Sequence, residues 1–193
     1  VLIPRPDTET WLEKVIQYYR NETGLKVADL GTGSGAILVG FLYYCRDAVG
    51  VGVDISTEAL KIAEENGQNL KITDRVEWRQ GDYLKAFDEE DIFDGIFSNP
   101  PYIPTKDIGG LSREVKHEPR LALDGGTDGL YFYHLLAKGA AEHLKPGGFL
   151  AVEFGIGQAT DILEMFRKSA QYEDFEVIKD YGGIERALYC RKK

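Results

Sequence analysis

Three stretches of this sequence combine residue types and spacings that could carry chemistry. Asp29 precedes a run of alternating glycines at 31–35, Asp54 ends an apolar run, and an Asn-Pro-Pro-Tyr segment at 99–102 follows another apolar run. Glycines let a backbone turn tightly and approach a ligand closely, and carboxylate and carbonyl oxygens accept hydrogen bonds. Together these stretches indicate a bound small molecule beside a second ligand group whose N–H donates hydrogen bonds.

The glycine turn reads Asp29-Leu30-Gly31-Thr32-Gly33-Ser34-Gly35 and opens a helical pattern. The free amides and the positive dipole end of such a helix suit a carboxylate or a phosphate. The glycines alone do not choose between a nicotinamide dinucleotide and S-adenosyl-L-methionine, because the loose dinucleotide pattern also fits. Asp29 favours S-adenosyl-L-methionine, since its carboxylate attracts an ammonium and a sulfonium and repels a diphosphate.

Acidic residues after the next two strand patterns extend the predicted cofactor site. Asp54 can accept hydrogen bonds from two vicinal ribose hydroxyls, while Ser56 fits the role of helix cap. Asp82 could accept from an adenine amino group, and Tyr83 could pack against the ring. For that pair a polar turn with a half-buried aromatic stays open as the alternative.

The most specific motif is Asn99-Pro100-Pro101-Tyr102. Two prolines fix the backbone and remove two N–H donors, which leaves carbonyl oxygens free to accept. The Asn99 side-chain oxygen and the Pro100 carbonyl can each take one hydrogen of a planar NH2 group, and Tyr102 can stack on its flat face. The motif therefore predicts methylation of an amide or amino nitrogen.

The reaction would be an in-line displacement at the methyl carbon. A carboxamide nitrogen is a poor nucleophile because its lone pair is delocalised. Acceptors on its two hydrogens raise its electron density and fix its direction, which is catalysis by proximity and electrostatics. We identify no general base, and the proton can leave to water.

The elements that position these residues follow from apolar periodicity. Helical patterns cover 8–20, 36–45, 56–70, 130–144 and 159–169. Strand patterns cover 26–30, 49–53, 75–79, 92–98, 149–154, 175–179 and 186–190, with a turn at 145–148 and a long loop at 99–126. Alternating strands and helices predict a doubly wound, Rossmann-like α/β fold: a mainly parallel seven-stranded sheet, helices on both faces and an antiparallel C-terminal strand pair.

Composition narrows the class of protein. The net charge of −9 argues against holding nucleic acid by its phosphates. No apolar run is long enough to span a bilayer, so we expect a cytoplasmic protein without membrane contact. Cys45 and Cys190 lie in apolar stretches and are expected to be buried free thiols, and no Cys/His spacing suggests a metal site.

Taken together, the motifs resemble a known family. The glycine turn, Asp54 and the Asn-Pro-Pro-Tyr segment resemble class I S-adenosylmethionine methyltransferases. The stretches Leu2-Ile-Pro-Arg-Pro-Asp-Thr-Glu9, Glu114-Val115, His117-Glu118-Pro119 and Leu123-Asp-Gly-Gly-Thr-Asp-Gly-Leu130 closely resemble the release-factor glutamine N5-methyltransferases. This similarity covers essentially the whole chain.

The resemblance implies a substrate and a set of site residues. In that family the methyl acceptor is the glutamine of the Gly-Gly-Gln motif in peptide chain release factors. The predicted cofactor contacts are Asp29, Leu30, Gly31, Thr32, Gly33, Asp54, Ile55, Asp82, Tyr83 and Asn99. The predicted glutamine contacts are Asn99, Pro100, Pro101 and Tyr102, of which Asn99, Pro100 and Tyr102 are the predicted catalytic residues.

The resemblance also bears on the domain organisation. It implies that residues 1–193 form a single catalytic domain, and that the family's small upstream helical domain, which helps to grip the release factor, is absent from this chain. Full-length substrate is then expected to bind more weakly. The resemblance places Arg5 and Glu9 in a segment that packs near the active site.

Other functions stay open on the residues alone. A DNA adenine N6-methyltransferase would use the same Asn-Pro-Pro-Tyr pocket for a flipped base, but the acidic charge and the lack of a target-recognition domain argue against it. A non-catalytic module with the same fold is a second alternative. A dinucleotide oxidoreductase is the third, supported only by the glycine turn and Asp54.

Overall fold

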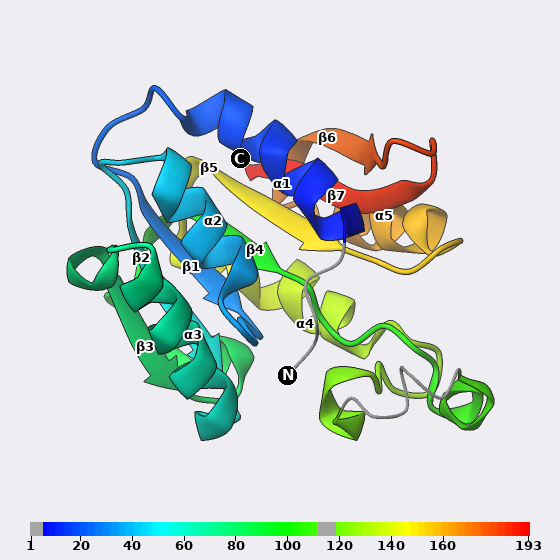
Figure 1. Cartoon of the computed structure of the whole chain (residues 1–193). Coiled ribbons are helices and arrows are strands. Elements are labelled where there is room, and N and C mark those ends of the chain that lie inside the picture. Colours follow the sequence, from blue (N-terminus) through cyan, green and yellow to red (C-terminus); the bar gives the residue numbers. More distant parts are fainter. Residues whose placement is uncertain (1–5, 112–118) are drawn as a thin grey trace.

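The computed structural model describes residues 6–111 and 119–193. Its strands form one sheet in the order β3-β2-β1-β4-β5-β7-β6 (Figure 1). The strands are β1 (Lys26–Leu30), β2 (Val49–Asp54), β3 (Val76–Gln80), β4 (Phe93–Ser98), β5 (Leu144–Glu153), β6 (Tyr172–Lys179) and β7 (Glu185–Lys192). The first five are parallel, whereas β7 runs antiparallel to β5 and β6. The predicted fold class is confirmed.

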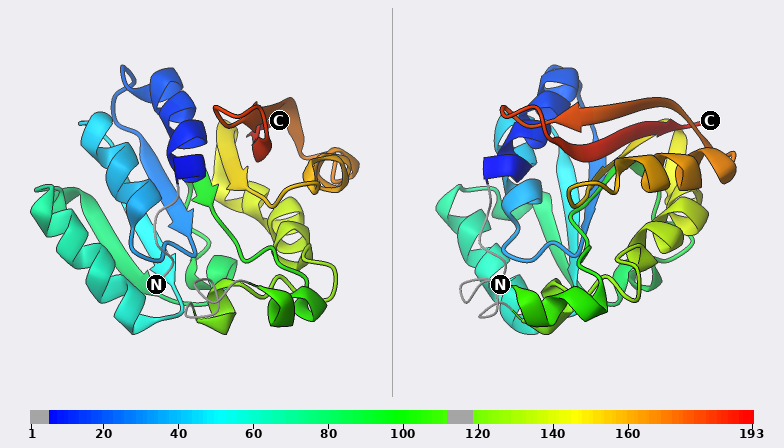
Figure 2. Two further views of the ribbon diagram at one scale, coloured as in Figure 1. Left: turned by 45° about the vertical axis from the view of Figure 1, so that its right-hand side comes forward. Right: turned by 90° about the vertical axis from the view of Figure 1, so that its right-hand side faces the viewer.

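Helices cover both faces of the sheet (Figure 2). They are α1 (Pro6–Tyr19), α2 (Ala36–Tyr44), α3 (Thr57–Asn69), α4 (Tyr131–Gly139) and α5 (Ala159–Lys168). One buried cluster joins α1 and α2 to the sheet, and a second joins α4 and α5 to it. Strands buried on both sides fit the near-continuous apolar patterns in the sequence. None of the helices in the described part of the chain is long and apolar enough to cross a membrane.

Local signals place several elements where the sequence predicts them. Ser56 caps α3, because its hydroxyl accepts the Ala59 N–H at 3.2 Å. Cys45 and Cys190 are buried free thiols, as expected. Strand β2 runs on to Asp54, so this carboxylate stands at the edge of the sheet.

The predicted helix over 130–144 is wrong at its end. Helix α4 stops at Gly139, a 3-10 turn η6 (Ala140–His143) follows, and Leu144 already belongs to β5. Leu144 pairs with Phe93 at the start of β4, and this pairing requires an extended backbone. The predicted turn at 145–148 is a bulge within β5, since the next paired residue after Leu144 is Phe149.

Other boundaries shift by a few residues. Helix α1 starts at Pro6, because proline suits the first helical position. A 3-10 turn, η1 (Thr73–Arg75), delays β3 to Val76. Strands β6 and β7 are longer than predicted, because pairing with each other extends them. The loop 99–126 contains the 3-10 turns η3 (Thr105–Gly110) and η5 (Arg120–Ala122) in its described part.

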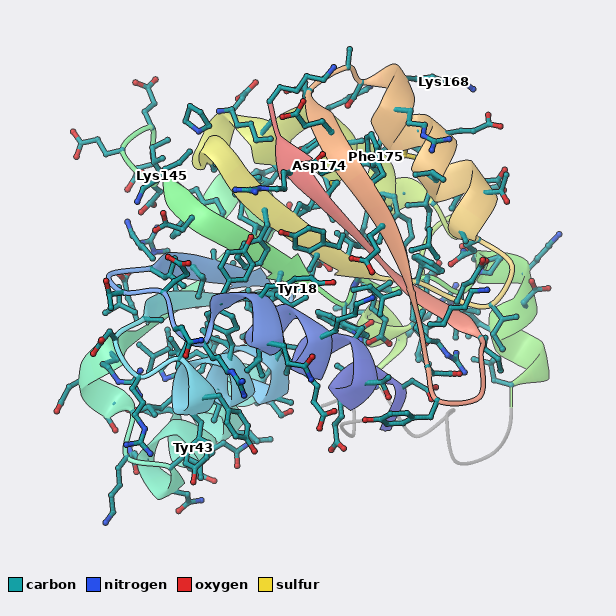
Figure 3. The ribbon with its side chains drawn as sticks, turned by 90° about the horizontal axis from the view of Figure 1, so that it is seen from above. Tyr18, Tyr43, Lys145, Lys168, Asp174 and Phe175 are labelled. Carbon is teal, nitrogen blue, oxygen red and sulfur yellow. The ribbon has the colours of Figure 1, made fainter. Side chains whose placement is uncertain are left out.

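Helix α1 is fastened to the C-terminal hairpin formed by β6 and β7. Glu176 on β6 forms an ion pair with Lys14 and accepts the Tyr18 hydroxyl at 2.9 Å. Tyr18 projects from α1 toward the hairpin when the molecule is seen from above (Figure 3). The hydroxyls of Tyr19 and Tyr189 are 2.7 Å apart. These contacts fix the helix whose first turn reaches the candidate site.

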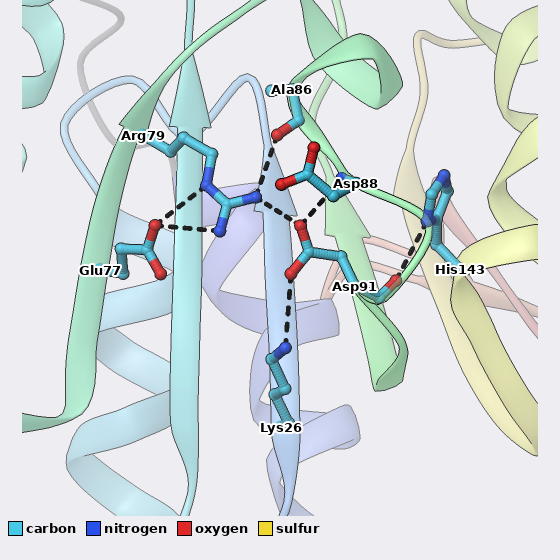
Figure 4. Close-up of polar contacts among 7 residues, drawn as sticks. All are labelled: Lys26, Glu77, Arg79, Ala86, Asp88, Asp91 and His143. Atoms are coloured by element: carbon cyan, nitrogen blue, oxygen red, sulfur yellow. Dashed lines mark hydrogen bonds and ion pairs between the residues drawn. The ribbon is translucent and has the colours of Figure 1, made fainter.

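A polar network around Asp91 ties the segment before β4 to two strands (Figure 4). The Asp91 carboxylate accepts from Arg79 on β3, from Lys26 on β1 at 3.4 Å, and from the Asp88 N–H at 3.1 Å. His143 Nδ1 lies 3.0 Å from the Asp91 carbonyl oxygen. The carboxylate is 11% exposed, so the network contributes to stability from inside the fold.

Candidate active site

A cavity of about 350 Å³ opens at the carboxyl ends of the parallel strands. Nine of the predicted site residues line it: Gly31, Thr32, Gly33, Asp54, Ile55, Asp82 and Tyr83, together with Asn99 and Pro101 from the Asn-Pro-Pro-Tyr motif. Open α/β sheets bind ligands at this edge, where the strand order reverses. A larger and more open depression of about 490 Å³ lies between α1 and β6, but no predicted site residue borders it.

The glycine turn has a backbone that only glycine adopts without strain. The φ angles of Gly31, Gly33 and Gly35 are 72°, 58° and 76°. A Cβ on Gly31 would lie 2.8 Å from the Tyr83 hydroxyl, so a side chain does not fit there. Gly35 precedes α2 and offers no side-chain cap, so no side chain of the N-cap residue occupies the amide end of this helix beside the cavity.

Asp54 holds this turn in place. One carboxylate oxygen accepts the Gly33 N–H at 2.8 Å, and the other accepts the Ser56 N–H at 2.9 Å. Each oxygen keeps a further acceptor position on a carboxylate that lines the cavity. The aspartate therefore has both a structural role and the capacity to bind a diol.

Asp29 lies beneath the turn rather than on the cavity wall. It is fully buried, and its Oδ2 accepts the Thr32 hydroxyl at 2.6 Å. Its Oδ1 has no hydrogen-bond partner among the described residues. Burial raises the pKa of Asp29 to about 7. Leu30 is likewise buried, and its carbonyl accepts the Ser98 hydroxyl at 2.8 Å.

Asp82 and Tyr83 begin the 3-10 turn η2 (Tyr83–Ala86). The Asp82 carboxylate is 49% exposed and pairs with Lys85. Tyr83 stacks on Phe132, with ring centroids 4.6 Å apart. Its hydroxyl is buried beside Gly31, and burial raises the pKa of Tyr83 well above its usual value. The aromatic wall of the cavity is thus a pair of rings, of which the sequence suggested only one.

The Asn-Pro-Pro-Tyr motif starts directly where β4 ends. Asn99 and Pro101 face the cavity, whereas Pro100 and Tyr102 are not among its lining residues. The Tyr102 ring instead packs against Gly155, and its carbonyl accepts from the Gln158 side chain at 3.0 Å. The structure therefore brings Asn99 together with Asp54 and Thr32, and turns the Tyr102 ring away from them.

Sequence reasoning missed several residues near the cavity. Thr8 and Phe132 line it, and Glu153 at the end of β5 accepts from the Thr8 hydroxyl at 2.6 Å and from Trp11 Nε1 at 2.8 Å. The position of Glu153 was a usable signal, because Asp29 and Asp54 also stand near strand ends. Gln158 carries no such signal, since its partners are backbone atoms.

The predicted segments at 2–9 and 114–119 are described only in part. Arg5 and the stretch 114–118 lie outside the described residues. Glu9 is exposed on the first turns of α1. Among the residues that the structure describes, no group of His, Cys, Asp and Glu is arranged to hold a metal ion.

Residues 21–153 match the family model described as a methyltransferase domain. The structure is similar to that of a methyltransferase from Pyrococcus furiosus, with a TM-score of 0.69 at 21% identity over 99% of this chain and 84% of that one. It also resembles an RNA methyltransferase from Salinibacter ruber solved in complex with S-adenosyl-L-homocysteine, with a TM-score of 0.60 at 18% identity over 100% of this chain and 94% of that one. The chain contains a methyltransferase domain, and its fold is the one found in these methyltransferases.

Similarity in sequence narrows this class. The chain is 45% identical over 99% of its length to the release factor glutamine methyltransferase of Bradyrhizobium diazoefficiens, and 42% identical over 100% of its length to that of Moorella thermoacetica. It spans 65% and 68% of the lengths of these two relatives. The chain belongs to the family of release factor glutamine methyltransferases.

Proposed function

We propose that this chain transfers a methyl group from S-adenosyl-L-methionine to the side-chain nitrogen of the glutamine in the Gly-Gly-Gln motif of a peptide chain release factor. The observation that carries this proposal is that Asn99 shares one cavity with Asp54 and the glycine turn. A cofactor site and an acceptor of N–H groups therefore open into the same space. The names of the relatives support the choice of substrate.

The residues of the cavity suit S-adenosyl-L-methionine. Asp54 offers carboxylate oxygens to a ribose diol, and the amide end of α2 suits a carboxylate. Asp29 lies beneath the turn and accepts the Thr32 hydroxyl, so it supports the cavity wall without lining it. When bound, the cofactor supplies a methyl group on a positively charged sulfur, so the leaving group needs no acid.

The protein's own part in the reaction is to hold the amide. The Asn99 side-chain oxygen and the Pro100 carbonyl accept the two hydrogens of the glutamine NH2 group. As the new N–C bond forms and the C–S bond breaks, these oxygens stabilise the positive charge that develops on nitrogen. The proton then leaves to water.

Mass spectrometry tests this function directly. A release factor incubated with the chain and S-adenosyl-L-methionine should gain one methyl group, and fragmentation should place it on the Gly-Gly-Gln glutamine. A release factor with that glutamine replaced by alanine is the matched control and should gain none. Methylation of adenine in duplex DNA, with no change in the release factor, would replace this proposal with the alternative substrate.

Calorimetry separates an enzyme from a non-catalytic module. The chain should bind S-adenosyl-L-methionine in the absence of any release factor, because the glycine turn is already formed. Failure to bind the cofactor at all would contradict the proposal before any substrate is considered.

A further inference from the structure

Gln158 joins three segments of the chain beside the Asn-Pro-Pro-Tyr motif. Its Nε2 donates to the carbonyls of Tyr102 at 3.0 Å and of Gly129 at 3.4 Å, while its Oε1 accepts the Gly155 N–H at 2.8 Å. The three partners come from the motif, from the segment before α4 and from the turn after β5. We refer to Gln158, Gly129 and Gly155 as the clasp.

The position of Gln158 is unusual for a helix start. It stands at the N-cap of α5, but its side chain makes no capping hydrogen bond there. Ser, Thr, Asp and Asn are the preferred residues at that position. A capping role therefore does not explain the glutamine, whereas its contacts across to Tyr102 do.

Glycines bring the clasp into contact with Tyr102, Gly129 with its carbonyl and Gly155 with its ring. A Cβ on Gly129 would lie 2.4 Å from the Tyr102 carbonyl oxygen, and one on Gly155 would lie 2.9 Å from Tyr102 Cδ2. A Cβ on Gly125 would lie 2.8 Å from the Pro101 carbonyl oxygen. Because real Cβ contacts are not that short, these positions allow the close approach only as glycine.

The clasp holds one end of a short, stiff turn. The other end is held by β4, where Ser98 pairs with Leu30 and Val152 and its hydroxyl donates to the Leu30 carbonyl. Between these ends the proline rings fix two φ angles. With both ends fastened, the direction of the Pro100 carbonyl has little freedom left.

We infer that Gln158 is a positioning residue: by fixing the Tyr102 carbonyl it aims the acceptor pair, Asn99 and the Pro100 carbonyl, at the substrate amide. The inference rests on the proposed function. It assigns Gln158 no contact with substrate or cofactor. Small misplacements of reacting groups cost turnover steeply, so a loosened turn should lower kcat rather than cofactor affinity.

The decisive variant is Gln158→Glu, which keeps the acceptor for Gly155 and loses the donor for Tyr102 and Gly129. Methylation of the release factor should fall in kcat by roughly 10- to 100-fold, while the Kd for S-adenosyl-L-methionine stays at the wild-type value. Hydrogen exchange of the ligand-free protein should become faster in the peptide that covers 99–104.

Gln171 supplies a matched control. Its Nε2 also donates to two backbone carbonyls, those of Ala137 at 3.1 Å and Lys138 at 3.2 Å, at the far end of α4 from the cavity. Gln171→Glu should lose comparable hydrogen bonds without any change in kcat or in exchange at 99–104. Equal effects of the two substitutions would show a general loss of stability and overturn the inference.

A second pair of variants tests the glycine contacts. Gly129 and Gly157 have similar φ angles, 79° and 86°, but only Gly129 lies against Tyr102. Both Gly129→Ala and Gly157→Ala strain the backbone, because both glycines have positive φ angles. Only Gly129→Ala should lower kcat, and Gly157→Ala should keep the wild-type value. A wild-type chain that methylates no release factor would refute the proposed function. If the wild-type chain is active and Gln158→Glu has the same kcat, only the inference that Gln158 is a positioning residue is refuted.

Discussion

Asn99 stands where β4 leaves the sheet and borders the same cavity as Asp54. Asn99→Ala removes the acceptor for one amide hydrogen and should lower kcat by about 100- to 1,000-fold, as loss of a charge-stabilising group does. The cofactor Kd should change little, because the carboxylate and the glycine turn stay in place. Methyl-transfer kinetics and calorimetry measure the two quantities.

Asn69 is a suitable control for that substitution, since it is exposed at the end of α3. Asn69→Ala should leave kcat and cofactor affinity at their wild-type values. If Asn99→Ala weakened cofactor binding as much as it lowered kcat, Asn99 would belong to the cofactor pocket instead.

Asp29 makes the stability of the protein depend on pH. Burial raises its pKa from the usual 3.8 to about 7, so between these values the folded state binds more protons than the unfolded state. Its unfavourable charge is therefore absent below about pH 4, grows as the pH rises, and levels off above about 7. Asp29→Asn should accordingly stabilise the protein increasingly across that window.

Urea unfolding at several pH values measures this effect. The difference in unfolding free energy between Asp29→Asn and wild type should approach about 4 kcal/mol at most, from 1.36 kcal/mol for each pKa unit. Asp74→Asn, at an exposed position before β3, should show no such trend. A difference that is constant with pH would mean that Asp29 titrates normally in the folded protein.

At the scale of elements, Glu153 links the end of β5 to the start of α1. Its buried carboxylate accepts from Thr8 and from Trp11, and Thr8 lines the cavity. Glu153→Ala would leave both donors without this acceptor and should lower the unfolding free energy by about 3 kcal/mol. Denaturant unfolding measures this change.

Glu164 offers the comparison for that variant, because it lies exposed on α5 and pairs only with Lys168 among the described residues. Glu164→Ala should change stability by less than about 0.5 kcal/mol. Similar losses for the two glutamates would show that the contacts of Glu153 with α1 contribute little.

Most elements could be predicted from the sequence, because periodicity and caps are local. Every expected strand exists, and Ser56 begins α3 as predicted. The end of α4 could not be predicted, since Leu144 becomes a strand residue only by pairing with Phe93 on β4. A pairing partner about fifty residues away in the chain leaves no signal in the sequence around Leu144.

The candidate site also contains residues whose positions could be predicted from the sequence and residues whose positions could not. Asp54 and Asn99 follow strands directly, so their place at the edge of the sheet could be predicted, and both line the cavity. The Tyr102 ring was expected at the substrate, but it packs against Gly155 in a turn that is distant in sequence. The pairing of Phe132 with Tyr83 depends equally on tertiary packing.

At the scale of the whole molecule, the Asp91 network holds β1, β3 and the segment before β4 together. Asp91→Ala would leave Arg79 without its most buried partner and should lower the unfolding free energy by about 3 kcal/mol. Glu77 contacts the same guanidinium, but its side chain is 59% exposed. Glu77→Ala should cost less than about 1 kcal/mol.

Denaturant unfolding of the two variants under identical conditions makes this comparison. Both carboxylates contact Arg79, but only Asp91 is buried and also accepts from Lys26 and the Asp88 N–H, so the difference between the variants measures the contribution of the buried network. Equal unfolding free energies of the two variants would show that the Asp91 network contributes little to the stability of the fold.

The reversal of strand order between β1 and β4 has an evolutionary consequence. The loops after β1, β2 and β3 carry the glycine turn, Asp54 and Tyr83, whereas the loop after β4 carries the Asn-Pro-Pro-Tyr motif. Strands β1 and β4 pair beneath the cavity, but the loops that line it come from different connections of the chain, so each set of loops can diverge separately. Under the proposed function, changes confined to the loop after β4 could alter the methyl acceptor, while the loops after β1, β2 and β3 keep the cofactor site unchanged.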